Sequence, residues 1–489
     1  MNQFLPGAAV AVMLLAGCTP PPPVATPASQ KSEIAELPRA PVPVPKQPEP
    51  AKPQPVVPSP APVPAPTPAP ITPPPSPEPK PAPTPAPPRP AKGQPLRPAA
   101  PPLPEPEGNV VTVDTADRLY AAVTRAQPGT TILLADGRYA LSQPLHIRAD
   151  QVSLRGRSGD RTKVVLDGGG KLAEAIWLST CSDVTVANLT IRDVQANGIK
   201  LNSDKNVQRL RVYNCEFRNV WQRAIKAVAV PAADRDRLAP QDCRIEYCLF
   251  ANDRPKKYGD DPNDTPASFG GEYIAGLDLM YATRWVIRDN VFRGINGRTG
   301  QGRGAVFLWC DSRECVIERN VIVDCDAGIS LGNALHGPKD PPHCISCIVR
   351  NNCVTHAPEG GIAALYTKDC KILHNSVCDP TGKIGRGIRV ELAADGLLVA
   401  NNLLAGPKVI INTPSRVETR DNREGINPAV FVDAATGDLH LTERVDGVTG
   451  AGKLLPDVRR DLDSRRRGER VDLGAHELAD ADRPRKIQN

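Results

Sequence analysis

The chain has 489 residues, 55 of them proline, and a formal net charge of only +6 at neutral pH. So small a charge gives no basis for nucleic-acid binding, which needs a strongly basic surface. Because 37 of the prolines lie within residues 19–107, the chain divides into a proline-rich part and a part of ordinary composition.

The first seventeen residues hold an apolar run that is too short to span a bilayer and is typical of a signal peptide. The run ends in Leu15-Ala16-Gly17-Cys18, which resembles the lipobox of bacterial lipoproteins, although no Lys or Arg precedes it. This resemblance implies removal of residues 1–17, a lipid anchor on Cys18 and a place in the cell envelope, with Thr19 favouring the outer membrane. The alternative is an ordinary secretory signal followed by an incidental cysteine.

Residues 18–107 form the predicted anchor and linker. Phrases such as PAPVPAPTPAPITPPP cannot bury a core, and we expect disordered, extended polyproline II there. We interpret the segment as a semi-rigid spacer between the membrane and the folded part, rather than as a docking site for proline-binding partners.

From residue 108 to residue 480 the sequence predicts a repetitive all-β domain, followed by a disordered tail at 481–489. Short β-branched runs recur around an asparagine every 20 to 35 residues, and no helical period accompanies them. The runs are VTVANLTI, LRVYNCEF, VIRDNVF, VIERNVIV, IVRNNCVT, KILHNSVC and LLVANNLLA, with CRIEYCLF as a weaker copy. Each run is too short to bury a face alone, so the repeats must stack into a solenoid.

The recurring asparagine is expected at the turn between two stacked strands, where amides from successive coils bond to one another. Asn290, Asn320 and Asn352 are the clearest members of this predicted ladder; we also align Asn188, Asn214 and Tyr247 with them. A second phrase follows each turn, in the pattern small, apolar, variable, apolar, as in NGIKLN and AGISLG. This pattern predicts a further strand with one buried face.

The phrase QPGTTILLADGRY resembles the N-terminal cap of right-handed parallel β-helix proteins, including the chondroitinase B and alginate lyase group. Before it we expect a strand and a short amphipathic helix containing Leu119, Ala122 and Val123. The C-terminal stretch from FVDAATGDLHL to VDLGAHEL resembles endings in which a final strand closes the stack. The resemblance implies a pectate lyase-like, single-stranded, right-handed β-helix of about nine to eleven coils.

Twelve cysteines remain after Cys18. Cys243, Cys315, Cys347 and Cys370 each precede a strand at the same place in the repeat, which predicts a buried column of small side chains. Disulfides between neighbouring coils are an alternative. Zinc at Cys344, Cys347 and His343 is a weaker alternative, because no second cysteine pair matches it.

Candidate functional residues occupy the outward positions of the second phrase, which should form a groove along the solenoid. By alignment, Lys200, Lys226 and Asp278 stack on successive coils, with Arg223 close by. A base and a cation are what cleavage of an acidic polysaccharide by β-elimination requires. In this hypothesis one Lys, made less basic by the other, is the base, and Arg223 holds the sugar carboxylate. The remaining predicted substrate-binding residues are Asn202, Asp278, Arg303, Phe307 and Trp309.

The chondroitinase B group uses a Lys and an Arg on adjacent coils in a similar way, but its own strand motifs are not recognisable here. Nor is there the Asp pair with Gly-His-Gly that marks polygalacturonases. The competing interpretation is that Lys200 and Lys226 merely keep an exposed sheet soluble.

The insertion at 251–273 interrupts the repeat and would wall the groove. Its Asp260, Asp261 and Asp264 are weak candidates for calcium ligands; the alternative is a mobile loop without a metal. We predict no other cofactor. The partners expected from the sequence are a polysaccharide or cell-wall glycan and a membrane, reached through the lipid anchor, with the chain acting as a monomer.

Two functional hypotheses remain. In the first, the chain is an envelope-anchored lyase, or less plausibly a hydrolase, that binds and cleaves an acidic polysaccharide. In the second, it is a non-catalytic scaffold of the envelope that binds glycan or peptidoglycan. The architecture is specific in this sequence, whereas the activity is not.

Overall fold

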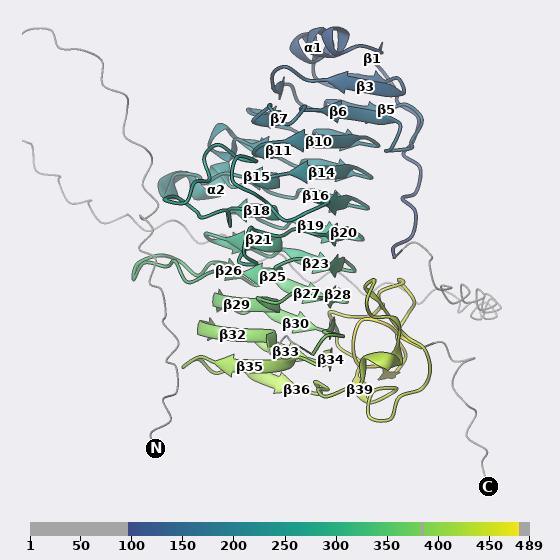
Figure 1. Ribbon diagram of the computed structural model, residues 1–489, viewed down its shortest axis with the longest axis vertical. Helices are drawn as coiled ribbons and strands as arrows, with labels where there is room; N and C mark the ends of the chain where they lie inside the picture. Colours follow the sequence, from purple (N-terminus) through teal and green to yellow (C-terminus); the bar gives the residue numbers. More distant parts are fainter. Residues whose placement is uncertain (1–95, 383–385, 479–489) are drawn as a thin grey trace, which may run out of the picture. The chain divides into compact units, whose positions relative to one another are not determined.

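The computed structural model describes residues 96–382 and 386–478 of the chain. The predicted signal peptide, Cys18 and most of the predicted linker lie outside the described residues. Parallel strands stack coil on coil into three long sheets, which we call sheets A, B and C (Figure 1). The fold is a right-handed parallel β-helix, as predicted.

Every coil contributes one strand to each sheet in turn. Sheet A consists of β1 (Val110–Val113), β2 (Thr131–Leu134), β5 (Ser153–Gly156), β9 (Thr185–Ala187), β13 (Arg211–Tyr213), β16 (Arg244–Glu246), β19 (Val286–Arg288), β23 (Val316–Glu318), β27 (Ile348–Arg350), β30 (Lys371–Leu373), β33 (Leu398–Ala400) and β36 (Glu418–Arg420). Sheet B consists of β3 (Gly137–Ala140), β6 (Val164–Asp167), β10 (Thr190–Val194), β14 (Glu216–Val220), β17 (Leu249–Ala251), β20 (Val291–Arg293), β24 (Val321–Val323), β28 (Cys353–Thr355), β31 (Ser376–Cys378) and β34 (Leu403–Ala405).

Sheet C carries the candidate site. Its strands are β4 (Leu145–Ile147), β7 (Glu174–Leu178), β11 (Asn197–Leu201), β15 (Arg223–Ala227), β18 (Ala275–Met280), β21 (Gly304–Trp309), β25 (Ala327–Leu331), β29 (Gly360–Lys368), β32 (Arg386–Asp395) and β35 (Lys408–Asn412), extended at one end by β22 (Ser312–Arg313) and β26 (Cys344–Ile345). A small separate ladder pairs β8 (Cys181–Ser182) with β12 (Val207–Gln208). The ten strands of sheet B, one in each coil, agree with the predicted number of coils.

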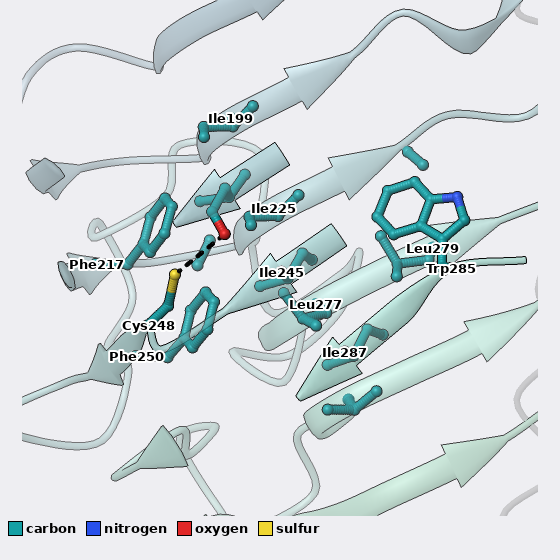
Figure 2. Close-up of a cluster of buried hydrophobic side chains, with 14 of the residues drawn as sticks. Ile199, Phe217, Ile225, Ile245, Cys248, Phe250, Leu277, Leu279, Trp285 and Ile287 are labelled. Atoms are coloured by element: carbon teal, nitrogen blue, oxygen red, sulfur yellow. Dashed lines mark hydrogen bonds between the residues drawn. The ribbon is translucent and has the colours of Figure 1, made fainter. Parts of the chain in front are cut away.

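The core is a set of stacked columns, in which each inward side chain lies on its equivalent in the next coil (Figure 2). Phe217 stacks on Phe250 with ring centroids 4.9 Å apart, and Phe250 stacks on Phe292 at 4.5 Å. These rings explain the small residue that opens each sheet C phrase. A Cβ atom at Gly198 would lie 2.9 Å from the ring of Phe217, too close for any side chain.

A ladder of buried asparagines runs along the turn from sheet A to sheet B. Asn290 donates from Nδ2 to Oδ1 of Asn320 at 3.0 Å, and Asn320 donates in the same way to Asn352 at 2.9 Å. The ladder continues, as the repeated runs predict, through Asn375 and Asn402 to Asn422.

The alignment of the first coils with this ladder was wrong by one residue. Asn188, Asn214 and Tyr247 have φ near +55°, like Asp289, which directly precedes the ladder residue Asn290. The ladder column in these three coils is instead occupied by Leu189, Cys215 and Cys248, and the Cys248 N–H donates to Oδ1 of Asn290 at 2.8 Å. Asparagine suits both places, since it tolerates a left-handed backbone and also bonds through its amide.

The predicted cysteine column is present. Cys243, Cys315, Cys347 and Cys370 are fully buried free thiols on neighbouring coils, and Trp285 fills the same place between the first two. Burial raises the pKa of the Cys243 thiol to about 12, so this side chain is an inert apolar filler.

The helix α1 (Ala116–Arg125) covers the N-terminal end of the stack, as predicted, with Leu119 and Val123 buried (Figure 1). The other helical segments are short: η1 (Ser203–Lys205), η2 (Ala232–Asp234), α2 (Arg235–Leu238) and η3 (Pro428–Val430). Within the described residues, none of the helices has the length and apolar character needed to cross a membrane.

The C-terminal segment does not close the stack as expected. Its strands β37 (Phe431–Asp433) and β38 (Asp438–Leu441) pair with each other, and β39 (Gly452–Lys453) pairs with β40 (Arg470–Val471). Leu439, Leu441 and Leu473 pack instead on apolar side chains of the outer face of sheet B, such as Val321 and Leu403. The outward side chains of sheet B are apolar here, and the C-terminal segment buries this apolar surface instead of the end of the stack.

The fold also begins before the predicted boundary at residue 108. Residues 96–104 run along the turn between sheets A and B, where Pro101 accepts a hydrogen bond from the Tyr213 hydroxyl and Pro104 accepts one from Arg155. Their first arginine, Arg97, is buried and bonds to Asp289 and to the carbonyl of Leu462. We call residues 96–104 the strap. Two of its contacts are made by backbone carbonyls, which every residue has, so these contacts could not be predicted from the proline-rich sequence.

Candidate functional site on sheet C

The outward positions of sheet C are in the register expected from the sequence. Lys200 pairs with Lys226, Lys226 with Asp278, and Asp278 with Phe307 on consecutive strands. The same column continues through Ser330, Ala363 and Arg389. Inward residues such as Ile225 and Leu277 are fully buried, so the apolar alternation in the sequence determines which side chains point outward.

Asp278 is the centre of the site. Its Oδ2 accepts a hydrogen bond from Arg223 Nε and another from Lys226 Nζ, both at 2.7 Å. Its Oδ1 accepts a third from Trp309 Nε1 at 2.9 Å. One carboxylate on β18 therefore gathers three predicted site residues from the two neighbouring strands, β15 and β21.

The charge of Asp278 is stabilised by its neighbours although its side chain is only 1% exposed. Burial alone would raise its pKa, but Lys226 and Arg223 outweigh this and hold the pKa well below its usual range. Asp278 is therefore a permanent anion and a poor proton acceptor. It positions other side chains, and its predicted direct contact with substrate is corrected to this supporting role.

Arg223 is equally inaccessible, with 1% of its side chain exposed. Its guanidinium lies 3.8 Å from the ring centroid of Tyr273, which comes from the insertion, and its Nη1 donates to the carbonyl of Gln222. The hypothesis that Arg223 binds a substrate carboxylate directly does not agree with this burial. The cations that a ligand can reach are the exposed Arg303, Lys200 with 29% of its side chain exposed, and Lys226 with 10%.

Lys200 lies in a second polar cluster one coil away. Its ammonium is 3.1 Å from Oε1 of Glu174, which also accepts a hydrogen bond from Asn197 at 2.6 Å. The indole of Trp177 donates to the other oxygen of Glu174. Lys200 and Lys226 thus each have a carboxylate partner, whereas the hypothesis of a catalytic base depended on repulsion between the two lysines.

Asn202 is half-buried beside this cluster. Its Nδ2 donates to the hydroxyl of Ser179 at 2.9 Å, and that hydroxyl lies 3.1 Å from Nε2 of His146. The short polar row extends the outward face toward the N-terminal end of the sheet. Neither Ser179 nor His146 could be identified from the sequence, because neither belongs to the repeated phrase.

The two predicted aromatic residues have different roles. Trp309 is half-exposed, whereas Phe307 is 3% exposed and stacks against the indole at 5.3 Å. The prediction that Phe307 packs on a sugar ring is therefore wrong. It supports Trp309, whose ring is held in place by Phe307 and by the hydrogen bond to Asp278.

The acidic residues of the insertion are already paired with cations of the chain. Lys256 is completely buried, with Nζ 2.8 Å from Asp264 and 3.3 Å from Asp261. Asp260 forms a bidentate pair with Arg254. The geometry therefore favours ion pairs over the calcium hypothesis for these three carboxylates. Asp264 also accepts from the Tyr273 N–H at 3.1 Å, so this buried pair positions the ring that covers Arg223.

A second loop, residues 294–303, is fastened to its neighbours by two acids. Asp326 accepts from the N–H groups of Gly297 and Gly302 through the same oxygen, at 2.6 and 2.7 Å. Glu272 accepts from Thr299 and Gln301. Burial raises the pKa of Asp326 to about 6, despite the two hydrogen bonds that oppose the change.

An aromatic cluster, which the sequence did not reveal, lies further along sheet C. His336 stacks on Tyr366 with ring centroids 4.0 Å apart, and the buried His343 contacts both rings and Trp309 edge-on. His343 Nδ1 accepts from the Cys310 N–H, and burial lowers the pKa of His343 to about 4. This neutral histidine is thus a packing residue, and the zinc alternative at Cys344 and Cys347 has no support here.

Among the described residues, one group has the spacing of metal ligands: His440, Asp463 and His476, in the C-terminal segment. The Leu441 N–H donates to His476 Nδ1, which leaves the proton on Nε2 and no free lone pair for a metal. His440 lies between Asp438, at 2.5 Å, and Asp463, at 3.2 Å, and these bonds raise its pKa to about 9 against the effect of burial. A protonated histidine therefore explains this group better than a metal does.

Comparison with known proteins agrees with the fold. Residues 174–404 match the family model for the right handed beta helix region, and no curated protein matches the chain. The class defined by the fold is thus the right-handed β-helix proteins, with polar and aromatic side chains along one parallel sheet.

Many solved structures are similar to this chain at low identity, and three of them illustrate the range. The tailspike protein of Escherichia coli bacteriophage HK620, solved with a pentasaccharide, has 15% identity and a TM-score of 0.45 over 61% of this chain and 55% of its own. An alginate lyase from Paenibacillus has 13% identity and a TM-score of 0.34 over 63% of this chain and 99% of its own. The GH136 lacto-N-biosidase from Eubacterium ramulus has 13% identity and a TM-score of 0.42 over 66% of each chain. This chain spans about half the length of the tailspike chain, and similarity at this level does not establish a ligand.

Proposed function

We propose that the outward face of sheet C binds an acidic polysaccharide that runs along the solenoid axis. The observation that carries this proposal is the buried carboxylate of Asp278, which holds Lys226 and the half-exposed ring of Trp309 on neighbouring strands. A cation beside an accessible aromatic ring suits a carboxylated sugar, because the charge binds the acid and the ring packs on the sugar face.

The charge balance of this face supports an anionic ligand. Five consecutive strands of sheet C, from β7 through β11, β15 and β18 to β21, carry the cations Lys200, Arg223 and Lys226 and the acids Glu174 and Asp278. Arg303, directly before β21, adds a fourth cation, so cations outnumber acids by four to two. The strands are about 4.8 Å apart, comparable with the length of one sugar unit. A linear polysaccharide can therefore place successive units on successive coils.

Binding is supported better than cleavage. A catalytic base must accept a proton from the substrate. Lys226 Nζ instead donates a hydrogen bond to Asp278, and this ion pair favours the charged ammonium, which cannot accept a proton. Asp278 itself is a poor base, because its pKa is lowered. Cleavage by β-elimination remains the second candidate function, favoured by the concentration of cations that would stabilise an enolate.

The location that we propose is the cell envelope. The apolar N-terminal run and the lipobox-like sequence before Cys18 support a lipid anchor, and the proline-rich segment supports a spacer that lifts the β-helix from the membrane. Metabolic labelling with a radioactive fatty acid tests the anchor. Label should enter the natural protein but not the Cys18→Ser variant, and label in both proteins would exclude Cys18 as the anchor.

Calorimetry with alginate, polygalacturonate, chondroitin sulfate and a neutral glucan tests the binding function. We expect an acidic polymer to bind with a salt-sensitive affinity, and Lys226→Met to weaken it about tenfold, the usual effect of losing a charge-assisted hydrogen bond. Lys163→Met, an exposed lysine between sheets A and B, is the matched control. Equal affinity of the Lys226→Met protein would overturn the site, and unsaturated sugar ends detected by ultraviolet absorbance would establish cleavage.

A further inference from the structure

The aromatic cluster around Tyr366 lies on the same face as the site, toward the C-terminal end of sheet C. Trp309 belongs to β21 and Tyr366 to β29, two strands further along the sheet. The outward column beside them, which starts at Phe307, continues with the small residues Ser330 and Ala363. The buried ring of His343 contacts both Trp309 and Tyr366 edge-on and so links the two aromatic residues.

Tyr366 is held in an unusual conformation. Its φ is +51°, in the left-handed region, which is uncommon for a bulky residue, and the register of β29 with β32 shifts at this point. At this irregularity the Tyr366 ring stacks on the imidazole of His336, with an angle of 10° between the two ring planes. Both rings are half-exposed, and the Tyr366 hydroxyl makes no hydrogen bond to any described residue.

The next strand supplies a cation. Arg389 on β32 is in register with Ala363 on β29, and its side chain lies beside Gly360 of the same strand, with Nε 3.6 Å from the position that a Cβ atom would take there. This buried Nε has no hydrogen-bond partner, and Nη1 is 3.6 Å from Glu391. Arg389 thus has donor capacity that its neighbours do not use.

We propose that Tyr366, His336 and Arg389 form a second subsite, which binds a carboxylated sugar unit of the same polysaccharide. The inference rests on the proposed function and extends it. The rings pack on the sugar face, and the guanidinium of Arg389 binds the carboxylate, as Trp309 and Lys226 do at the first site. Arg389 lies three strands, or about 14 Å, beyond Trp309, so only an oligosaccharide of several units reaches both subsites.

The test is calorimetry with the full chain and a length series of acidic oligosaccharides, from disaccharide to octasaccharide. For the natural protein we expect affinity to rise steeply once the oligosaccharide spans both subsites. Tyr366→Gly and Arg389→Met should each reduce binding of the octasaccharide about three- to tenfold, the usual size of one stacking or charged contact, and affect the disaccharide far less. Lys226→Met should weaken every length.

Tyr366→Gly also separates binding from folding. Glycine adopts a positive φ without strain, so the melting temperature should stay unchanged or rise while octasaccharide binding falls. Arg420→Met, an exposed arginine on sheet A, is the matched control for Arg389. Unchanged octasaccharide binding in both the Tyr366 and the Arg389 variants would overturn the second subsite alone. Absence of binding at every length in the natural protein would overturn both proposals.

Discussion

Arg97 and Asp289 are 192 residues apart in the sequence and form a buried ion pair, with Nη2 of the arginine 2.8 Å from Oδ1 of the aspartate. The same Nη2 donates to the carbonyl of Leu462 at 2.7 Å. One side chain therefore joins the N-terminal strap, the middle of the solenoid and the C-terminal segment.

Replacing Arg97 by Met should destabilise the fold by about 3 kcal/mol, because it leaves the Leu462 carbonyl and part of the Asp289 charge without a donor. Asp289 keeps its pair with Arg319, which limits the loss. Urea unfolding measures the effect. The exposed pair of Arg118 with Asp114 provides the control, and Arg118→Met should cost less than about 0.5 kcal/mol. Equal losses in the two variants would show that the strap contributes nothing to stability.

Removal of one ladder amide should be more damaging. Asn320 accepts from the N–H and the Nδ2 of Asn290 and donates to the carbonyl of Ile287 and to Asn352, all within the core. Asn320→Ala leaves these groups buried without partners, so we expect a loss of about 4 kcal/mol or more of unfolding free energy.

Thermal melting followed by circular dichroism measures this loss. Asn263→Ala, in an exposed part of the insertion, is the matched control and should change the melting temperature little. A small shift for Asn320→Ala would mean that water replaces the missing amide.

Stability should fall in alkaline solution through His440. Its pKa is about 9 in the folded chain against 6.5 without its partners, so the protonated form is bound more tightly by the fold. The stabilisation is complete below about pH 6.5 and is lost as the pH rises through 9. It amounts to about 3 kcal/mol from the size of the shift.

Melting temperatures of the natural protein and of His440→Gln, measured from pH 6 to pH 10, test this expectation. The difference between the two proteins should be large at pH 6 and small at pH 10. If added zinc raises the melting temperature of the natural protein but not of the variant, a metal site replaces the protonated histidine.

Asp326 should also lower the stability of the natural protein as the pH rises, because its buried carboxylate is charged at neutral pH. Its folded pKa of about 6 is above the ordinary 3.8, so its contribution is favourable below about pH 3.8 and is lost as the pH rises through 6. Asp326→Asn cannot ionise and keeps an acceptor for Gly297 and Gly302. We expect the variant to be more stable than the natural protein by about 1–2 kcal/mol at pH 8 and equal to it near pH 4.

Chemical denaturation at the two pH values gives this comparison. Glu424→Gln, an exposed acid near the end of the solenoid, serves as the control variant. A destabilised Asp326→Asn protein at pH 8 would show that the hydrogen bonds of loop 294–303 need the full negative charge.

The repeated phrases were sufficient to predict the β-helix and the register of sheet C. Strand alternation forces Ile225 and Leu277 inward, so Lys226 and Asp278 must point outward and stack, whatever the loops do. The ladder at Asn290 and Asn320 follows from the same periodicity. The one-residue error at Asn188 and Asn214 arose because asparagine suits two adjacent positions of the turn, and local sequence does not distinguish them.

Only the tertiary structure decided which charges meet. Lys256, Asp264 and Tyr273 belong to an insertion without a sequence period, so its path could not be predicted. In the folded chain Tyr273 lies over Arg223, and Lys256 forms an ion pair with Asp264, one of the carboxylates considered for calcium. His336 and Tyr366 come together in the same way, through a loop and a bulge. Periodic burial fixes the scaffold from sequence alone, whereas the site depends on segments that lack a period and are positioned by contacts distant along the chain.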